Sequence, residues 1–506
     1  MNMKTFSRQL GQILLTAFSS LGLISCAVGP DFRVPDAPLV DKYTQSPMPE
    51  KTVASDTVGG VEQRFISGRD IPRQWWSLFQ SEALDRLIRM ALQESPSVAL
   101  AEARLREARE NRAVQFGTLF PSIDAGVSAS QQKISGASLG EPDLIIDSFN
   151  LFNASVGVSY TLDIFGGQRR QLEALDAQVE YQGYQLEGAY LVLTSNIVTT
   201  AMLEASLRLQ MRATRDIIDY QSEQLRLVEK RYEVGAVPLS DVLTQRAQLA
   251  QSQAALPVLE KNLSFRHHQL AVLVGKLPGE IQLPEFELES MSLPQELPVS
   301  MPSSLVRQRP DIKAAEAVLH AASAEVGVAT ANLYPKITLT GSYGFAANSI
   351  SDLFDSRSIV WNFGAGLLQP LFHGGALTAR RRAAIALYDQ ALAQYRITIL
   401  QSFQNVADVL RALEADALTL QAQATAEKAA SESLDLTQKQ YQLGAVSYLS
   451  LLNAQRQYQE AHILLVQAQA ARFADTAALF AAMGGGWWNN ESRDTETADS
   501  LKEKSP

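Results

Sequence analysis

The sequence predicts an α+β membrane protein built from a tandem duplication of one helix–hairpin–helix unit. Three observations favour this class. Two segments of about 65 residues have helical periodicity and contain no proline. Four shorter segments alternate apolar and polar residues with a period of two, as β-strands do. Finally, the same landmarks recur in the same order in both halves of the chain.

The composition excludes several classes of protein. The 506 residues include 54 Asp and Glu against 44 Lys and Arg, for a formal net charge of −10. Nucleic-acid-binding proteins carry a basic stripe, and this chain has no cluster of five or more Lys or Arg. Hydrophobic residues make up 46% of the chain, which is too many for a disordered protein. After the N-terminus, no apolar run approaches the roughly 20 residues of a membrane-spanning helix, which argues against a polytopic helical membrane protein.

Residues 1–25 have the features of an export signal. Lys4 and Arg8 precede a short apolar stretch whose end is weakened by small residues. The only cysteine, Cys26, follows Leu-Ile-Ser at the expected cleavage position, and a single cysteine cannot form an internal disulfide. The pattern resembles a bacterial lipobox, which implies a covalent diacylglycerol and an N-acyl lipid on Cys26; a chance cysteine is the alternative. Ala27, rather than Asp, favours passage of the lipoprotein to the outer membrane.

A duplication with a spacing of roughly 210 residues organises the rest of the chain. Three pairs of landmarks match in order: Phe120-Pro121 with Tyr334-Pro335, Asp163–Gly167 with Pro370–Gly375, and Arg231–Val237 with Gln440–Val446. The chain therefore divides into five parts: an extended segment 26–78, a first repeat 79–275, a proline-rich acidic connector 276–303, a second repeat 304–486 and a tail 487–506. We expect the extended segment and the connector to form an equatorial region and the polar tail to be disordered.

Each repeat is predicted to contain a helix, two strands, a very long helix, a glycine turn and a returning helix. The first helix covers 79–118 and has an amphipathic stripe. Leucine and valine recur every seven residues in the long segment, which indicates a coiled-coil seam. A helix of this length spans about 95 Å. The long and returning helices are expected at 168–232 and 239–275, which Pro257 interrupts, and at 376–442 and 447–483.

The strands are expected as two hairpins, 121–132/152–163 and 335–347/359–372. Each strand has about ten residues, which matches a tilted strand that crosses an outer membrane. A half-buried hairpin in a soluble sheet would show the same alternation. The positions of the aromatic residues favour the membrane interpretation, because they lie at strand ends, where membrane barrels have girdles of interfacial aromatic residues. These residues are Phe120, Phe152, Phe165, Tyr334, Trp361 and Phe372.

Four strands per chain imply an oligomer. They cannot close into a barrel alone, and an open edge in hydrocarbon would leave backbone groups unpaired. Two chains would form an eight-stranded barrel that side chains fill, whereas three chains would form a twelve-stranded barrel with room for an aqueous lumen. A homotrimer is therefore the smallest assembly expected to conduct.

These features resemble the TolC-type outer membrane factors of tripartite efflux systems, and most closely their lipoprotein, NodT-like branch. The resemblance covers nearly the whole chain from Cys26 to Trp487. It is carried by Cys26–Phe32, Trp75-Trp76 with Phe79, Arg309–Ile312, Ala331–Ile337, Leu371–Gly375, Gln455-Arg456 and Gly484–Trp487. It implies a homotrimeric twelve-stranded outer-membrane barrel, continued by a long periplasmic coiled-coil barrel. Such a protein would be the passive exit duct for an inner-membrane pump of the resistance–nodulation–division type and a periplasmic adaptor.

The resemblance also places a gate at the periplasmic tip, around two Tyr-x-x-Gly turns. These turns are Tyr232 to Gly235 and Tyr441 to Gly444, and both glycines are expected at positive φ. The two tyrosines either donate hydrogen bonds in a closed state or simply pack. The adaptor is expected to contact the turns at Gly235, Gly444, Val237 and Val446.

Four further residues are expected to form the gate. By resemblance, Leu449 is the apolar constriction, and Arg456 is the basic neighbour of position 453. Relatives have aspartate at that position, and Asn453 departs from the pattern, so it would form an uncharged ring. Three copies of Asp241 would form an acidic ring that filters cations. Asp241 could instead cap the helix start together with Ser240.

Catalysis has little support in the sequence. The five histidines form no HExxH motif or Cys/His cluster, and GxGxxG, Walker A and GxSxG motifs are absent. We therefore expect no enzyme, no metal site and no cofactor beyond the lipid on Cys26. The competing interpretation is a lipid-anchored periplasmic scaffold or adaptor without a pore, with the hairpins packed as a soluble β-domain. That protein would not need aromatic residues at its strand ends.

Overall fold

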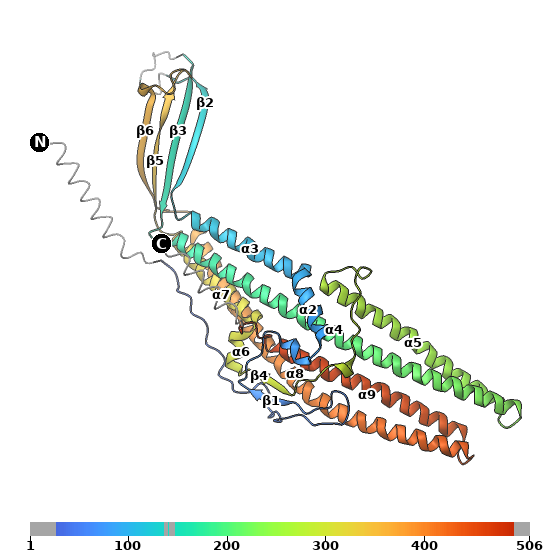
Figure 1. Cartoon of the computed structure of the whole chain (residues 1–506). Helices are drawn as coiled ribbons and strands as arrows, with labels where there is room; N and C mark the ends of the chain where they lie inside the picture. The colour runs from blue at the N-terminus through green and yellow to red at the C-terminus, as the bar shows by residue number, and fades with distance from the viewer. Residues whose placement is uncertain (1–26, 136–139, 141–146, 490–506) are drawn as a thin grey trace. The chain divides into compact units, whose positions relative to one another are not determined.

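The computed structural model describes residues 27–135, 140 and 147–489, and it shows one order of elements twice (Figure 1). The first set is α2 (Glu82–Glu94), α3 (Pro96–Gly117), β2 (Ser122–Gln132), β3 (Phe149–Leu162), α4 (Gly167–Glu233) and α5 (Leu239–Val274). The second set is α6 (Pro302–Gln308), α7 (Pro310–Ala331), β5 (Lys336–Ala347), β6 (Ile359–Leu368), α8 (Ala376–Gln442) and α9 (Tyr448–Ala482). The proposed export signal, Cys26 and residues 490–506 of the tail lie outside the described residues.

The chain also divides into two compact units, and neither coincides with a sequence repeat. Unit 1 contains the residues up to Pro35, Leu105–Gln182 and Ala315–Tyr395. Unit 2 contains Asp36–Arg104, Gly183–Ala314 and the residues from Arg396 onward. Each unit thus takes corresponding segments from both repeats, and α4 and α8 contribute to both units. The repeats describe the order of elements along the chain, but they are not separate compact bodies.

Unit 1 contains an antiparallel sheet of four strands in the order β2-β3-β5-β6 (Figure 1). Its register places apolar residues opposite one another across all four strands. In one such row, Ala125 lies opposite Val156, Val156 opposite Tyr343, and Tyr343 opposite Trp361. Because side chains alternate between the faces of a sheet, one face is mainly apolar and the other carries mainly serine, threonine, asparagine and glycine.

Two strand ends differ from the expected positions by more than one residue. β3 begins at Phe149, three residues before the expected start. β6 ends at Leu368 instead of Phe372, because Pro370 has no N–H to donate to a ladder hydrogen bond. The side chain of Gln369 instead donates from Nε2 to the carbonyl oxygen of Leu333 at 3.2 Å. The strand therefore stops where its backbone can no longer pair.

The single helix expected over 79–118 is wrong. A short 3₁₀ helix, η1 (Trp75–Phe79), is followed by α2 and α3, which Ser95 separates. Ser95 is extended, with φ −67° and ψ 124°, because the following Pro96 disfavours the helical conformation in the residue before it. Arg309 before Pro310 separates α6 from α7 in the same way, with φ −76° and ψ 128°.

The two long helices, α4 and α8, each run for 67 residues without a break. The returning helix α5 also continues through Pro257, so the expected interruption is absent. Among the described helices, α4 is also long and apolar enough to cross a membrane by length and composition alone, which the search for apolar runs did not reveal. Leu193, Ile197 and Met202 of α4 are nevertheless buried in the core of unit 2.

The core of unit 2 contains the aromatic residues of η1 and the end of α9. Trp75 stacks on Phe480, with ring centroids 5.4 Å apart. After α9 the chain passes close to η1 through three glycines at positive φ, and a Cβ on Gly486 would lie 2.3 Å from the carbonyl oxygen of Ile71. Trp487 then donates from Nε1 to the carbonyl oxygen of Gln308 at 2.6 Å. The tail that we expected to be disordered from residue 487 is therefore ordered through Asn489.

Segments outside the two repeats are also part of unit 2. β1 (Arg64–Ser67) pairs in parallel with β4 (Glu296–Val299), so the extended segment meets the connector in a small sheet. The connector also contains a short 3₁₀ helix, η3 (Leu288–Ser290). A further 3₁₀ helix, η4 (Ser356–Ser358), lies in unit 1, just before β6. The connector is thus structured by its contacts with the N-terminal segment.

Arg472 holds the extended segment against α8 and α9. Its fully buried guanidinium donates to Thr52 Oγ1 at 2.8 Å and to the carbonyl oxygens of Gly59 and Val61, both at 3.0 Å. Burial lowers the pKa of Arg472 to about 10. Nearby, burial and the carboxyl group of Asp475 raise the pKa of Asp416 to about 7.

Candidate channel tip and strand-base pocket

The two glycine turns of unit 2 have the same backbone geometry. Gly235 and Gly444 have φ of 73° and 74°, as expected for glycine after a helix. At the first turn, Gly235 N donates to Tyr232 O at 2.9 Å, and Ala236 N donates to Arg231 O at 2.8 Å. The second turn repeats both bonds, at 3.0 and 2.8 Å. This hydrogen-bond pattern is a Schellman motif, which ends a helix and reverses the chain.

The helices that follow the turns begin differently. Ser447 caps α9, accepting a hydrogen bond at Oγ from Ser450 N at 3.2 Å. Pro238 occupies the N-cap position of α5, which has no side-chain cap hydrogen bond. The alternative in which Asp241 caps this helix together with Ser240 is therefore wrong. Asp241 lies in the first turn of α5, where its negative charge interacts favourably with the helix dipole.

A small apolar core lies directly behind the turns. It consists of buried residues from α4, α5 and α9, with half-buried neighbours that include Val237 and Tyr441. Tyr441 packs with its ring centroid 5.7 Å from that of Tyr448, and the guanidinium of Arg231 lies 5.1 Å from the Tyr441 ring. Tyr232 at the matching position is exposed. The structure therefore places Tyr441 as a packing residue. The buried residues of this core are Val228, Val242, Tyr448, Leu451 and Leu452.

A layer of hydrogen bonds joins α9 to α4 and α5 beyond this core. The hydroxyl of Tyr448 donates to Gln245 Oε1, and Gln245 Nε2 donates to the carbonyl oxygen of Gln221 at 3.1 Å. Gln455 Nε2 donates to the hydroxyl of Tyr220 at 3.3 Å. Burial raises the pKa of both tyrosines. The sequence patterns did not indicate a role for Tyr448, Tyr220 or Gln245, although a glutamine on the core-facing side of a long helix was an available signal.

The expected constriction residues lie on one exposed face of α9. Leu449 is 64% exposed, and Asn453, four residues later, is also exposed. Arg456 does not pair with Asn453 here; its Nε donates to Gln248 Oε1 on α5 at 2.9 Å. The last residue before each turn glycine is apolar and exposed as well: Val234 is 79% exposed and Leu443 85%. The tip thus presents apolar side chains that this chain does not cover itself.

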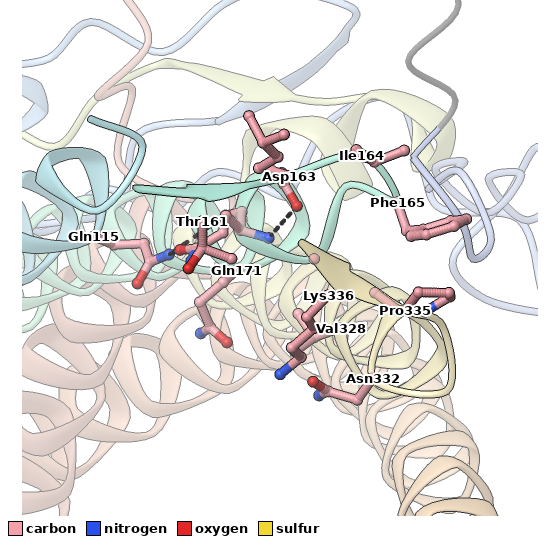
Figure 2. Close-up of a pocket in the computed structure, with 14 residues that line it drawn as sticks. Gln115, Thr161, Asp163, Ile164, Phe165, Gln171, Val328, Asn332, Pro335 and Lys336 are labelled. Atoms are coloured by element: carbon pink, nitrogen blue, oxygen red, sulfur yellow. Dashed lines mark hydrogen bonds between the residues drawn. The ribbon is translucent and has the colours of Figure 1, made fainter. Parts of the chain in front are cut away.

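A pocket of about 250 Å³ lies in unit 1 where strands β3 and β5 meet helices α4 and α7 (Figure 2). Asp163 accepts hydrogen bonds from the backbone N–H groups of Gln168 and Arg169, at 3.0 and 2.9 Å, and so caps the start of α4. Phe165 stacks on Tyr334, with ring centroids 4.7 Å apart. Two of the expected girdle aromatics therefore lie together at the strand base.

The segment that follows Cys26 is docked beside this pocket. Val28 N donates to the carbonyl oxygen of Phe165 at 3.0 Å. Gly29 has φ of 102°, and a Cβ there would lie 2.4 Å from the Cα of Gly327 on α7. Only glycine allows so close an approach. Asp31 then forms an ion pair at 2.7 Å with the buried Arg170.

A ring contact completes this docking. Phe32 stacks on the imidazole of His320 at 4.4 Å, and Nε2 of that histidine lies 3.1 Å from Glu173 Oε1. The residues Val28–Phe32 are thus held by hydrogen bonds, an ion pair and a ring stack. Cys26 itself lies outside the described residues, two positions before Val28.

No catalytic constellation emerges among these residues. In the described part of the chain, no three or more His, Cys, Asp or Glu side chains are grouped to hold a metal ion. The fold instead combines a four-stranded sheet that has one apolar face with long paired helices and glycine turns. This combination defines a class of protein, the channels of bacterial outer membranes.

The comparisons agree with this class. The family described as outer membrane efflux protein matches residues 87–276 and 301–485, so the chain belongs to this family. The pyoverdine export outer membrane protein OpmQ of Pseudomonas aeruginosa is 35% identical over 82% of this chain and 88% of its own. The probable efflux pump outer membrane protein TtgC of Pseudomonas putida is 28% identical over 97% of this chain and 98% of its own.

A solved structure supports the same assignment. The structure described as the outer-membrane channel OprN has a TM-score of 0.83 and 28% identity, and it covers 91% of this chain and 100% of its own. The protein is therefore an outer membrane efflux channel and not an enzyme. The resemblance to TolC-type outer membrane factors is confirmed.

Proposed function

We propose that three copies of this chain assemble into one channel with a twelve-stranded barrel. The observation that carries the proposal is the sheet of unit 1, in which the order β2-β3-β5-β6 leaves one edge of β2 and one edge of β6 unpaired. Hydrocarbon cannot satisfy the backbone groups of an open edge, and the apolar face of the sheet requires hydrocarbon. β2 of one copy would therefore pair with β6 of the next. Two copies would give eight strands and a filled interior, so three copies are needed for a lumen.

The long helices would continue this channel into the periplasm, with the turns at its far end. Leu449 would narrow the opening, and the Asp241, Asn453 and Arg456 side chains would set its charge and closure. Tyr232 and Tyr441 would flank the aperture. Gly235, Gly444, Val237 and Val446 would meet a periplasmic adaptor that connects the channel to an inner-membrane pump of the resistance–nodulation–division type. The exposed Val234 and Leu443 support a partner at the turns, because removing apolar side chains from water lowers the free energy of the complex.

A lipid anchor on Cys26 would complete the attachment to the outer membrane. The docking of Val28–Phe32 on unit 1 supports this, since it holds the chain that follows Cys26 at the base of the strands. Each CH₂ of the diacylglycerol and the N-acyl chain that is buried in the membrane would contribute about 0.8 kcal/mol to the free energy of membrane binding. Mass spectrometry of the mature N-terminal peptide would show the lipid, and the Cys26→Ser variant would lack it.

The symmetry of purified particles tests the assembly. The full-length protein would be extracted in detergent, imaged and averaged without imposed symmetry. The expected particle has a three-fold axis and a detergent belt at one end only. A particle with no belt and no three-fold axis would overturn the channel assembly and support the alternative of a lipid-anchored scaffold.

A further inference from the structure

A cavity of about 290 Å³ lies in unit 2, among the helices α4, α8 and α9. Its volume is close to the lower end of the range for small-molecule sites. The half-buried Ile217 and Leu434 contribute apolar surface to its wall, and neither Leu449 nor Asn453 of the tip lines it. All of the lining residues belong to one chain, so the cavity does not depend on the assembly of several copies.

Two glutamines in the wall of this cavity have buried amide oxygens without a hydrogen bond. Gln221 on α4 is 2% exposed, and Gln455 on α9 is 6% exposed. Within the part of the chain that the structure describes, Oε1 of neither side chain has a hydrogen-bond partner. Nε2 of Gln455 donates to the hydroxyl of Tyr220 at 3.3 Å, which leaves the oxygen as the unpaired atom of that amide. Buried acceptors without a donor are unfavourable, so they indicate that a donor from a ligand would be stabilised here.

Two exposed carboxylates line the same cavity, Asp216 on α4 and Asp435 on α8. Among the described residues, neither carboxylate has an ion-pair or hydrogen-bond partner. No lysine or arginine is part of the cavity wall. The imidazole of His462, which also lines the cavity, lies with Nδ1 at 3.0 Å from Oε1 of Glu427. A positively charged ligand would therefore meet two free carboxylates, with no side-chain ammonium or guanidinium in the wall to compete.

Two half-buried tyrosines, Tyr220 and Tyr458, add aromatic rings to the wall. Burial raises the pKa of the Tyr458 hydroxyl, and nearby carboxylates raise it further. These carboxylates belong to Glu427, Asp216 and Asp435, so the electrostatic potential at this ring is negative. The face of a tyrosine ring itself attracts ammonium groups. The rings and the carboxylates thus favour the same kind of ligand.

The groups in the wall suit an organic cation better than a metal ion. In the described part of the chain, no three or more His, Cys, Asp or Glu side chains are grouped to hold a metal. A metal ion would also leave the aromatic and apolar parts of the wall without a contact. An organic ammonium ion has both a charged donor and an apolar body.

We infer that this cavity binds a small organic ammonium ion that has an aromatic or aliphatic body. The charge would be attracted by Asp216 and Asp435, and an ammonium N–H would donate to the unpaired amide oxygen of Gln221 or Gln455. The body would pack on the tyrosine rings and on Leu434. Because such a ligand would contact α4, α8 and α9 together, it would also stabilise the packing of these three helices.

Isothermal titration calorimetry with phenethylamine tests this site in the full-length protein in detergent. The probe is a small aromatic amine that is protonated at pH 7. Two analogues with the same ring serve as ligand controls: 2-phenylethanol is neutral, and 3-phenylpropionate is an anion. The protein should bind the amine and neither analogue. Thermal unfolding should agree, since only a ligand that binds the folded chain raises its Tm.

Aspartate variants locate the binding site. Asp216→Asn and Asp435→Asn should each weaken the binding of phenethylamine about threefold in 0.1 M salt, and the double variant about tenfold. Asp219→Asn on α4 and Glu432→Gln on α8 are the matched controls. Each control position is three residues from a lining aspartate and outside the cavity wall. Both controls should bind the amine as tightly as the parent protein.

Several results would overturn the inference. If 2-phenylethanol binds as tightly as phenethylamine, the cavity accepts apolar rings without regard to charge. If the two control variants weaken binding as much as the lining variants, the cause is the net charge of the helix surface. Displacement of the amine by an equal concentration of Mg²⁺ would indicate a metal site instead. A parent protein that gives no heat and no change in Tm with the amine has no such site. None of these results depends on the number of copies, so the trimeric channel is tested separately.

Discussion

Arg456 on α9 donates a hydrogen bond from Nε to Oε1 of Gln248 on α5, across 2.9 Å. The contact joins the returning helices of the two repeats, and the hydrogen bond of Tyr448 to Gln245 joins the same two helices nearer the turns. Any outward movement of α9 from α5 must break both bonds. This pair of contacts therefore stabilises the tip in the conformation that the structure shows.

Arg456→Ala is expected to favour opening of the tip. A hydrogen bond from a charged group at this exposed position contributes about 1 kcal/mol, so its loss should shift the balance toward the open state roughly fivefold. Single-channel recording in planar bilayers would show more frequent open events. The exposed neighbour Gln457→Ala is the control. Unchanged recordings for Arg456→Ala would show that this contact does not restrain the tip.

Leu449→Ala is expected to widen the constriction. The leucine is 64% exposed in the single chain, so its truncation removes apolar volume from the aperture without creating a cavity in the core. Apolar constrictions close pores by excluding water, and conductance should rise roughly twofold or more. Leu436→Ala, an exposed leucine on α8, controls for general effects. Equal conductance in Leu449→Ala and the parent would place the constriction elsewhere.

Asn453→Asp is expected to increase the preference of the tip for cations. Three added carboxylates would join the Asp241 side chains in a narrow section, where acidic rings act strongly. The reversal potential in a salt gradient should move toward the cation potential, and Asp241→Asn should move it the other way. Asn405→Asp, on the same long-helix scaffold but far along α8 from the turn, is the control. If both tip variants keep the parent reversal potential, neither residue lines the aperture.

Asp416→Asn is expected to stabilise the protein above neutral pH. Burial and the neighbouring Asp475 raise the pKa of Asp416 to about 7, well above its value near 4 in an unfolded chain. A raised pKa means that the stability contributed by this group is complete below about pH 4 and is lost as the pH rises through 7. The neutral amide avoids this loss, so the free energy of unfolding of Asp416→Asn should exceed that of the parent by roughly 1–2 kcal/mol above pH 7, after allowance for solvent screening.

Thermal unfolding at several pH values checks this prediction. The Tm advantage of Asp416→Asn over the parent should be present at pH 8.5 and shrink toward pH 5. Asp219→Asn, which removes an exposed carboxylate from α4, should show no such dependence. An advantage that stays constant with pH would mean that the substitution acts through packing and not through ionisation.

Much of the fold could be predicted because local patterns determine it. A long stretch without proline predicts a long helix, and α8 has the bounds expected for it, Ala376 to Gln442. The alternation of residues in the strands gave the two faces of the sheet. The errors fall where one residue overrides the pattern: Pro96 breaks the first helix, and Pro370 ends β6 early. Pro257 was expected to interrupt a helix, but α5 continues through it.

The site was less predictable, because its contacts are tertiary. The positive φ of Gly235 and Gly444 followed from the turn chemistry. The partner of Arg456 did not follow, because the family resemblance paired it with position 453, whereas the observed acceptor, Gln248, is 208 residues away. The roles of Tyr448 and Gln245 likewise depend on which helices meet, and periodicity along one helix does not give this information.

The division of the chain into two interleaved units has a consequence for export and maturation. Each unit is assembled from three separate stretches, and the last stretch of unit 2 begins only at Arg396. The sheet also forms late in translocation, because β3 pairs with β5, which lies about 175 residues further along the chain. A polypeptide halted midway through translocation would have neither body complete. Such a chain would expose the apolar surfaces that α8 and α9 cover, and it would be a substrate for periplasmic proteases.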